Sequence, residues 1–223
     1  MMKKLERLGD TRAPDGTTLT LYRHDGEYRI MVGAVELMSS RRHHSETVLA
    51  ELACEPLRAV ADARVLIGGL GLGFTLRAAL RVLGPSARVV VAELVAGVIA
   101  WNRNSEYALA AAALADERVE VREADVADVL RENPGAFDAI ILDVDNGADA
   151  LVSGANAALY RASGVRRAAE ALRAGGTLAY WSDRDDAAFE HALREAKLSF
   201  TSTHVRAHVT AGPWYTMYLA RRA

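Results

Sequence analysis

The stretch VLIGGLGLGF, residues 65–74, decides the fold class of this chain. It runs from a short apolar segment into a turn and then into the amphipathic segment FTLRAALRVLG, residues 74–84. A buried strand, a tight turn and a helix form the unit with which nucleotide-binding α/β domains commonly begin. Glycines let such a turn adopt backbone conformations closed to other residues, and they let a ligand touch the main chain. We expect four of them to form a cofactor-binding loop: Gly68, Gly69, Gly71 and Gly73.

The spacing of these glycines narrows the kind of ligand. Gly69-x-Gly71-x-Gly73 differs from the G-x-G-x-x-G of dinucleotide-binding turns, which disfavours a nicotinamide-dependent oxidoreductase. It is closer to the G-x-G-x-G of enzymes that bind S-adenosylmethionine, whose loop holds a nucleoside and an amino-acid tail and no pyrophosphate. A glycine-rich turn that only packs is the alternative for this segment taken alone.

Strand-like and helix-like segments alternate on the carboxyl side of the turn. Buried or alternating apolar runs predict strands at 63–69, 87–93, 118–123, 137–145 and 175–182. Amphipathic runs predict helices at 74–84, 95–104, 126–132, 156–173 and 186–196. The tail reads as two further β segments around Gly212-Pro213. This order predicts an α/β fold: a Rossmann-like, mostly parallel seven-stranded sheet with helices on both faces and an antiparallel last strand.

A small β meander is expected before this domain. Alternating segments at 17–23 and 27–32 flank the turn His24-Asp25-Gly26, and a third segment covers 34–38. Ser45 is expected to cap a helix that ends near Pro56. We therefore divide the chain into a meander at 1–40 and a Rossmann domain at 41–223.

Composition excludes several classes of function. The formal net charge is −2 and the pI about 6.3, so no overall charge attracts the chain to nucleic acid or membrane. The dense basic segments are Arg41-Arg42-His43-His44 and Arg166-Arg167. A single cysteine, Cys54, allows no internal disulfide, and no Cys/His spacing indicates a metal site. Without a secretory signal or a stretch of about 18 apolar residues, we expect a cytoplasmic protein with a small-molecule substrate.

Carboxylates follow the predicted strands where a bound nucleoside would lie. Glu93, with Leu94 beside it, stands about twenty residues beyond the glycines, where Rossmann folds place a ribose-binding acid. A solvated glutamate at a strand end is the alternative. Asp125 follows the next strand and can accept a hydrogen bond from adenine while Val126 packs on the ring. Asp125 can also cap the following helix, and both roles are compatible.

Two aspartates, Asp143 and Asp145, follow the fourth strand, at the edge where open α/β sheets bind ligands. A carboxylate there can orient or deprotonate an incoming amine or hydroxyl. Simple turn chemistry is the alternative, since Asp-Asn-Gly favours a turn. His44 is a further candidate base. On the substrate side the candidates are His43, Trp181 and Ser182, with rim packing as the alternative for each.

With these segments in hand, the chain resembles the spermidine/spermine synthase superfamily over roughly residues 30–185, most strongly at Val65–Arg77. The resemblance implies that Glu93 binds ribose, that Asp125 binds adenine and that Asp143 is the amine-activating base. It also implies polyamine biosynthesis as the setting and allows a homodimer through the meander.

The chain departs from that family at three places. Leu72 replaces the loop aspartate that holds the amine of decarboxylated S-adenosylmethionine. Asn146 stands where the family has its second acid, with Asp145 out of register by one. Ser45-Glu46 replaces a Tyr-His pair. We therefore predict a methyltransferase that uses S-adenosylmethionine, with aminopropyl transfer from the decarboxylated donor and non-catalytic ligand binding as alternatives.

Overall fold

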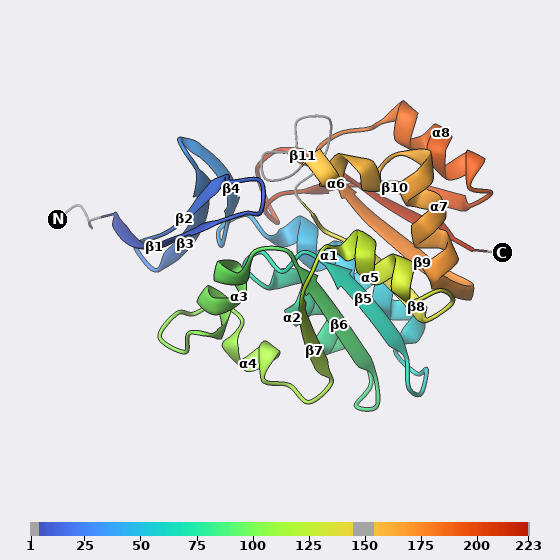
Figure 1. Cartoon of the computed structure of the whole chain (residues 1–223), viewed down its shortest axis with the longest axis horizontal. Coiled ribbons are helices and arrows are strands. Elements are labelled where there is room, and N and C mark those ends of the chain that lie inside the picture. Colours follow the sequence, from blue (N-terminus) through green and yellow to red (C-terminus); the bar gives the residue numbers. More distant parts are fainter. Residues whose placement is uncertain (1–4, 145–153, 223) are drawn as a thin grey trace.

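The computed structural model describes residues 5–144 and 154–222, which form two sheets (Figure 1). A four-stranded sheet has the order β1-β2-β3-β4, and a seven-stranded sheet has the order β10-β11-β9-β8-β5-β6-β7. The predicted fold class is confirmed: a small antiparallel sheet precedes a mostly parallel, helix-covered sheet.

The N-terminal sheet contains one strand more than the sequence predicted. Its strands are β1 (Glu6–Arg12), β2 (Thr18–His24), β3 (Glu27–Val32) and β4 (Val35–Ser39), all antiparallel. Strand β1 was missed because ERLGDTR is largely exposed and has no apolar alternation. The predicted turn is present: Asp25 and Gly26 both have positive φ, as a two-residue hairpin turn requires.

The main sheet has five parallel strands and an antiparallel pair at one edge. The parallel strands are β5 (Arg64–Gly68), β6 (Arg88–Glu93), β7 (Val119–Glu123), β8 (Phe137–Leu142) and β9 (Leu172–Ser182). Strand β11 (Trp214–Arg221) inserts antiparallel between β9 and β10 (Ser199–Arg206), as predicted. The central strands β5 and β8 are buried on both faces, and this explains their continuous apolar runs.

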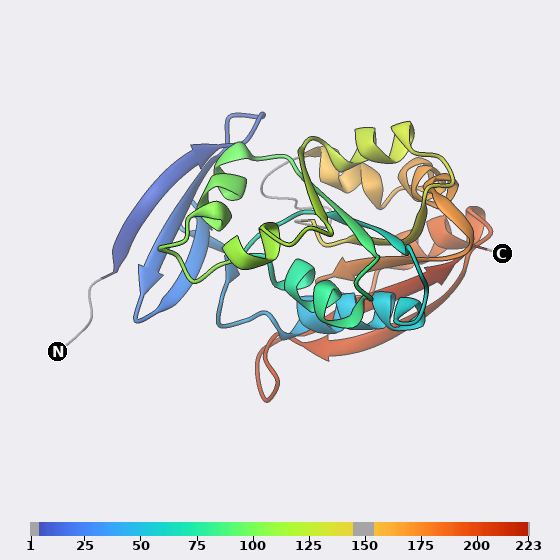
Figure 2. The same ribbon diagram turned by 90° about the horizontal axis from the view of Figure 1, so that it is seen from below.

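Helices cover both faces of the main sheet (Figures 1 and 2). Alternate residues of β5 divide between two hydrophobic cores: Val65 and Ile67 point to one, and Leu66 to the other. The first core takes side chains from α1 (His44–Cys54), α2 (Phe74–Val82) and α3 (Ala96–Arg103). The second takes them from α5 (Val126–Glu132), α7 (Ala162–Ala171) and α8 (Ala187–Glu195).

The first core continues into the N-terminal sheet. Leu19, Leu21 and Ile30 belong to the same buried cluster as Val65 and Ile67. Strand β1 also packs on α3, where a Cβ added to Gly97 would lie 2.3 Å from Thr11. Figure 2 shows the N-terminal sheet lying beside α3. The two sheets therefore share packing, and β3 and β4 lie next to the main domain.

Local predictions needed three corrections. The helix expected at 156–173 is two helices, α6 (Gly154–Leu159) and α7, and Gly164 lets α7 approach the end of α6: a Cβ there would lie 2.2 Å from the Ala158 carbonyl oxygen. Ser45 does not cap α1, which begins one residue earlier, and Pro56 lies in a 3₁₀ turn, η1 (Glu55–Leu57). The short α4 (Ala111–Leu114) was not predicted.

No helix within the described residues is long and apolar enough to cross a membrane.

Candidate functional site

The glycine loop between β5 and α2 is held in a conformation that requires glycine. Gly69, Gly71 and Gly73 all have positive φ, of 90°, 53° and 77°. A Cβ on Gly69 would lie 2.4 Å from the carbonyl oxygen of Asp143, so the loop and the end of β8 touch through their backbones. The loop therefore fixes the position of Asp143 as well as its own shape.

A pocket of about 80 Å³ lies beside this loop, at the carboxyl ends of the parallel strands. Seven of the residues predicted to contact the donor or the reacting group line it: Gly69, Gly71, Glu93, Leu94, Asp125, Val126 and Asp143. The N-terminal sheet closes it with apolar side chains: Leu19, Ile30, Leu37 and Met38.

Gly68 and Gly73 are not among the residues that line this pocket, and their predicted contact with the ligand stays a prediction. A Cβ on Gly68 would lie 2.8 Å from both Leu142 and Val126, and one on Gly73 would lie 2.3 Å from the Cβ of Ala110. Both glycines let neighbouring elements pack closely. Their role is to shape the loop from within the protein.

Glu93 is a buried acid that organises the loop. Its Oε2 accepts a hydrogen bond from the Leu70 amide and its Oε1 accepts one from the Val95 amide, each at 2.8 Å. Burial raises the pKa of Glu93, and the backbone amides act in the opposite direction. Contact with a ribose stays a prediction that this position allows.

Asp125 caps α5 and also lines the pocket. Its Oδ1 accepts a hydrogen bond from the Ala127 amide at 2.8 Å, so the predicted cap is present. The adenine contact predicted for Asp125 and Val126 stays a prediction, placed on the same wall as Glu93.

Asp143 stands at the centre of the candidate site. The hydroxyl of Thr75, in the first turn of α2, donates a hydrogen bond to Oδ2 of Asp143. Burial raises the pKa of Asp143 to about 6, and the bond from Thr75 opposes that shift. A carboxyl group with this pKa can exchange a proton near neutral pH.

Glu46 faces Asp143 and was not among the predicted site residues. Burial, and then the negative charge of Asp143, raise the pKa of Glu46 to about 8. The Ser45 hydroxyl donates to Glu46 Oε2 at 2.6 Å. The signal was present in the sequence: Glu46 has the helical spacing of the buried residues Leu49, Ala50 and Ala53.

The remaining predicted residues lie outside the pocket lining. His43 stacks on Phe74 with ring centroids 4.1 Å apart, and burial lowers its pKa. His44 begins α1, with its backbone amide bonded to the Ala207 carbonyl oxygen. The Ser182 hydroxyl donates a hydrogen bond to the Arg184 carbonyl oxygen at 2.7 Å. Trp181 packs on Tyr215 with ring centroids 4.4 Å apart. Asp145 lies outside the described residues.

Solved structures share this architecture. The chain is similar to a spermidine synthase solved with the transition-state analogue AdoDATO, with TM-score 0.76, 17% identity, and coverage of 99% of this chain and 74% of that one. It is also similar to spermidine synthase from Thermotoga maritima, with TM-score 0.75, 17% identity, and coverage of 99% of this chain and 75% of that one. A probable spermidine synthase from Corynebacterium glutamicum has TM-score 0.65 and 17% identity, with coverage of 96% of this chain and 79% of that one.

These likenesses confirm the structural side of the predicted resemblance: the chain has the fold of the spermidine synthases. No protein-family model matches the chain, and no curated protein matches it in sequence. At 17% identity the shared fold does not identify the reaction, which depends on the residues of the site.

Proposed function

We propose that this chain is a transferase that uses an adenosyl sulfonium donor, and that it transfers the methyl group of S-adenosylmethionine to a small acceptor. The observation that carries this proposal is the pocket, which brings the glycine loop, Glu93, Asp125 and Asp143 together at one sheet edge. Its three carboxyl groups and its apolar walls suit the polar and planar parts of a nucleoside.

Different residues of the pocket would contact different parts of the donor and the acceptor. Glu93 would accept hydrogen bonds from the ribose hydroxyls, while Asp125 and Val126 would receive the adenine. S-adenosylmethionine supplies an electrophilic methyl carbon and leaves as a thioether. Asp143, opposite the reacting centre, would take the proton of the attacking amine or hydroxyl. Burial raises the pKa of this base to about 6, which suits proton transfer near neutral pH.

Methyl transfer is preferred over aminopropyl transfer because of Leu72. In the resembled family this position carries the acid that binds the amine of the decarboxylated donor. Here Leu72 is buried in the first core and is not part of the pocket lining. No carboxylate therefore comes from the loop itself to bind a cationic tail or to repel the carboxylate of S-adenosylmethionine.

Aminopropyl transfer is the second candidate, favoured by the fold comparison. Solved structures similar to this chain include a spermidine synthase in complex with a transition-state analogue. The two candidates differ in their donor, so donor binding separates them.

Calorimetric titration tests the proposal directly. We expect S-adenosylmethionine or S-adenosylhomocysteine to bind at micromolar concentrations, and the Glu93→Gln variant to bind at least tenfold more weakly. Glu123→Gln, which changes an exposed glutamate at the end of β7, is the control and should bind as the parent does. Binding of the decarboxylated donor alone would favour aminopropyl transfer, and no binding by any adenosyl compound would reject both candidates.

A further inference from the structure

A second cleft lies on the opposite side of β3 and β4 from the donor pocket. It is formed by those strands, the segment before α1 and the turn between β10 and β11, and its volume is about 520 Å³. Ile30 points into the donor pocket while its neighbour Arg29 lines this cleft, as alternation along a strand requires. Other polar residues that line this basic cleft are Glu36, Ser39, Arg41, Arg42, His208 and Thr210.

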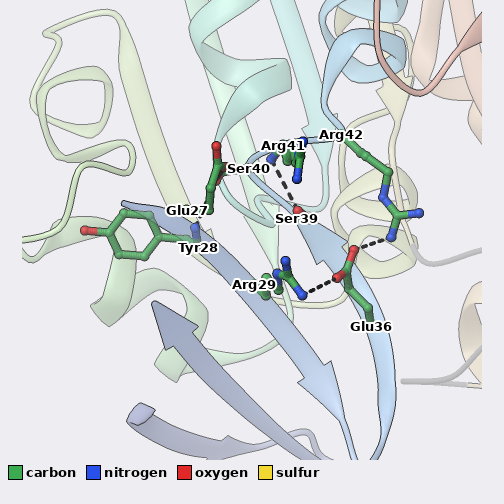
Figure 3. Close-up of polar contacts among 8 residues, drawn as sticks. All are labelled: Glu27, Tyr28, Arg29, Glu36, Ser39, Ser40, Arg41 and Arg42. Atoms are coloured by element: carbon green, nitrogen blue, oxygen red, sulfur yellow. Dashed lines mark hydrogen bonds and ion pairs between the residues drawn. The ribbon is translucent and has the colours of Figure 1, made fainter. Parts of the chain in front are cut away.

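The charges of the basic cleft are unbalanced. Three guanidinium groups, of Arg29, Arg41 and Arg42, face the single carboxylate of Glu36. Figure 3 shows Glu36 between Arg29 and Arg42, with Arg29 at 3.6 Å and Arg42 at hydrogen-bond distance. Arg41 has no ion-pair partner within residues 5–144 and 154–222. The nearby Glu27 is held by the hydroxyl of Ser40 at 2.6 Å.

One buried donor in the basic cleft lacks an acceptor. The Nε atom of Arg29 is buried, and no described residue accepts its hydrogen bond. Buried N–H groups of native proteins are almost always paired, by protein, water or ligand. Together with the excess of positive charge, this orphan donor indicates that an anionic group completes the cleft.

The basic cleft adjoins the carboxylate pair. Arg42 precedes Glu46 by four residues, so their Cα atoms lie at most about 14 Å apart. The charges of Arg42 and Glu46 also both act on the pKa of Tyr215, although burial is the main cause of its rise. The charge of Arg42 also lowers the pKa of Glu46 against the larger effect of burial, so the two side chains are near enough to interact.

We propose that the basic cleft binds a carboxylate or phosphate group of the acceptor, and so places the nucleophile of the acceptor at Asp143. The acceptor role rests on the function proposed above, whereas binding of an anion in the cleft does not. A cationic polyamine would meet like charges at Arg41 and Arg42, so this cleft discriminates against such an acceptor.

Titration with inorganic phosphate and with succinate, followed by calorimetry, tests the proposal. We expect the double variant Arg41→Gln/Arg42→Gln to bind the preferred anion at least tenfold more weakly than the parent. The matched control is Arg166→Gln/Arg167→Gln, an exposed pair of neighbouring arginines on α7, which should bind as the parent does. Glu36→Gln should strengthen binding, because it removes the carboxylate that competes for Arg29 and Arg42.

Three outcomes would overturn the proposal. The first is that neither phosphate nor succinate binds, and the second is that both double variants lose affinity equally. The third is that the anion competes with S-adenosylmethionine, since the cleft would then hold the carboxylate of the donor. Binding of S-adenosylhomocysteine is measured on the same variants and should stay at the parental value. A parent protein that binds adenosyl compounds but no anion therefore rejects this inference, and a parent protein that binds the anion but no adenosyl compound rejects the proposed function.

Discussion

Glu46 and Asp143 are partly buried acids whose raised pKa values make folding depend on pH. Between about pH 4.5 and 8 the folded chain keeps protons that the unfolded chain has released, so the free energy of unfolding falls as the pH rises. Glu46→Gln cannot ionise. We expect it to remove roughly 1–3 kcal/mol of this decline, as measured by urea unfolding at pH 5 and pH 8. Glu51→Gln, on the exposed side of α1, is the control.

The contribution of Glu46 must be separated from that of another buried acid, Glu93. Glu93 is also buried with a raised pKa and contributes a decline of the same sign, which stays in every variant. Only the difference between Glu46→Gln and the parent therefore reports on Glu46. Equal slopes in the two proteins would show that Glu46 is not buried beside Asp143.

Thr75 controls the acidity of Asp143 through one hydrogen bond. That bond stabilises the ionised carboxylate and lowers its pKa against the effect of burial. Thr75→Val should therefore raise the pKa of Asp143 above about 6, as read from the pH titration of its ¹³C-labelled carboxyl carbon. Thr177→Val alters another buried threonine, in β9, and should leave the titration unchanged. A fall in the pKa would contradict the hydrogen bond.

At the scale of elements, the β5–α2 loop depends on the absence of a side chain at Gly69. Gly69 and Gly16 share a φ of 90°, but only Gly69 has a neighbour, the Asp143 carbonyl oxygen, within reach of a Cβ. Gly16→Ala should lower the free energy of unfolding by about 1 kcal/mol, from backbone strain alone. Gly69→Ala should cost about 3 kcal/mol or more and abolish ligand binding. Equal costs in denaturant titrations would exclude the close backbone approach.

At the scale of the whole molecule, the N-terminal sheet forms one wall of the donor pocket. Met38 in β4 lies against Gly71 of the loop, where an added Cβ would be 2.8 Å from its sulfur atom. Met38→Ala should bind S-adenosylhomocysteine about tenfold more weakly because it loses apolar contact. Met31→Ala, in β3 and outside the pocket lining, should bind as the parent does.

A thermal shift gives a second readout of that wall. At a ligand concentration of 100 times Kd, the Tm of the parent should rise by roughly 5–10 °C. The shift should shrink for Met38→Ala at the same concentration. An undiminished shift would mean that the ligand binds without touching the N-terminal sheet.

Features that depend on neighbouring residues could be predicted from the sequence. The alternation of strands and helices, the glycine turn and the hairpin at Asp25-Gly26 follow from local periodicity and backbone sterics. Glu93 and Asp125 were placed correctly at the pocket because parallel strands all end at the same edge. The ribose and adenine roles given to them stay predictions.

The tertiary structure alone decided how distant segments meet. Glu46 reaches Asp143, almost a hundred residues later, because α1 packs over β8. The basic cleft is likewise lined by two segments that are distant in the sequence, residues 29–42 and the turn at 208–212. Local periodicity describes which side of an element is buried, but it carries no information about what lies across the interface. The chain by itself therefore determined the fold and which residues follow the parallel strands at the pocket, whereas packing between elements determined the carboxylate pair and the arginines beside it.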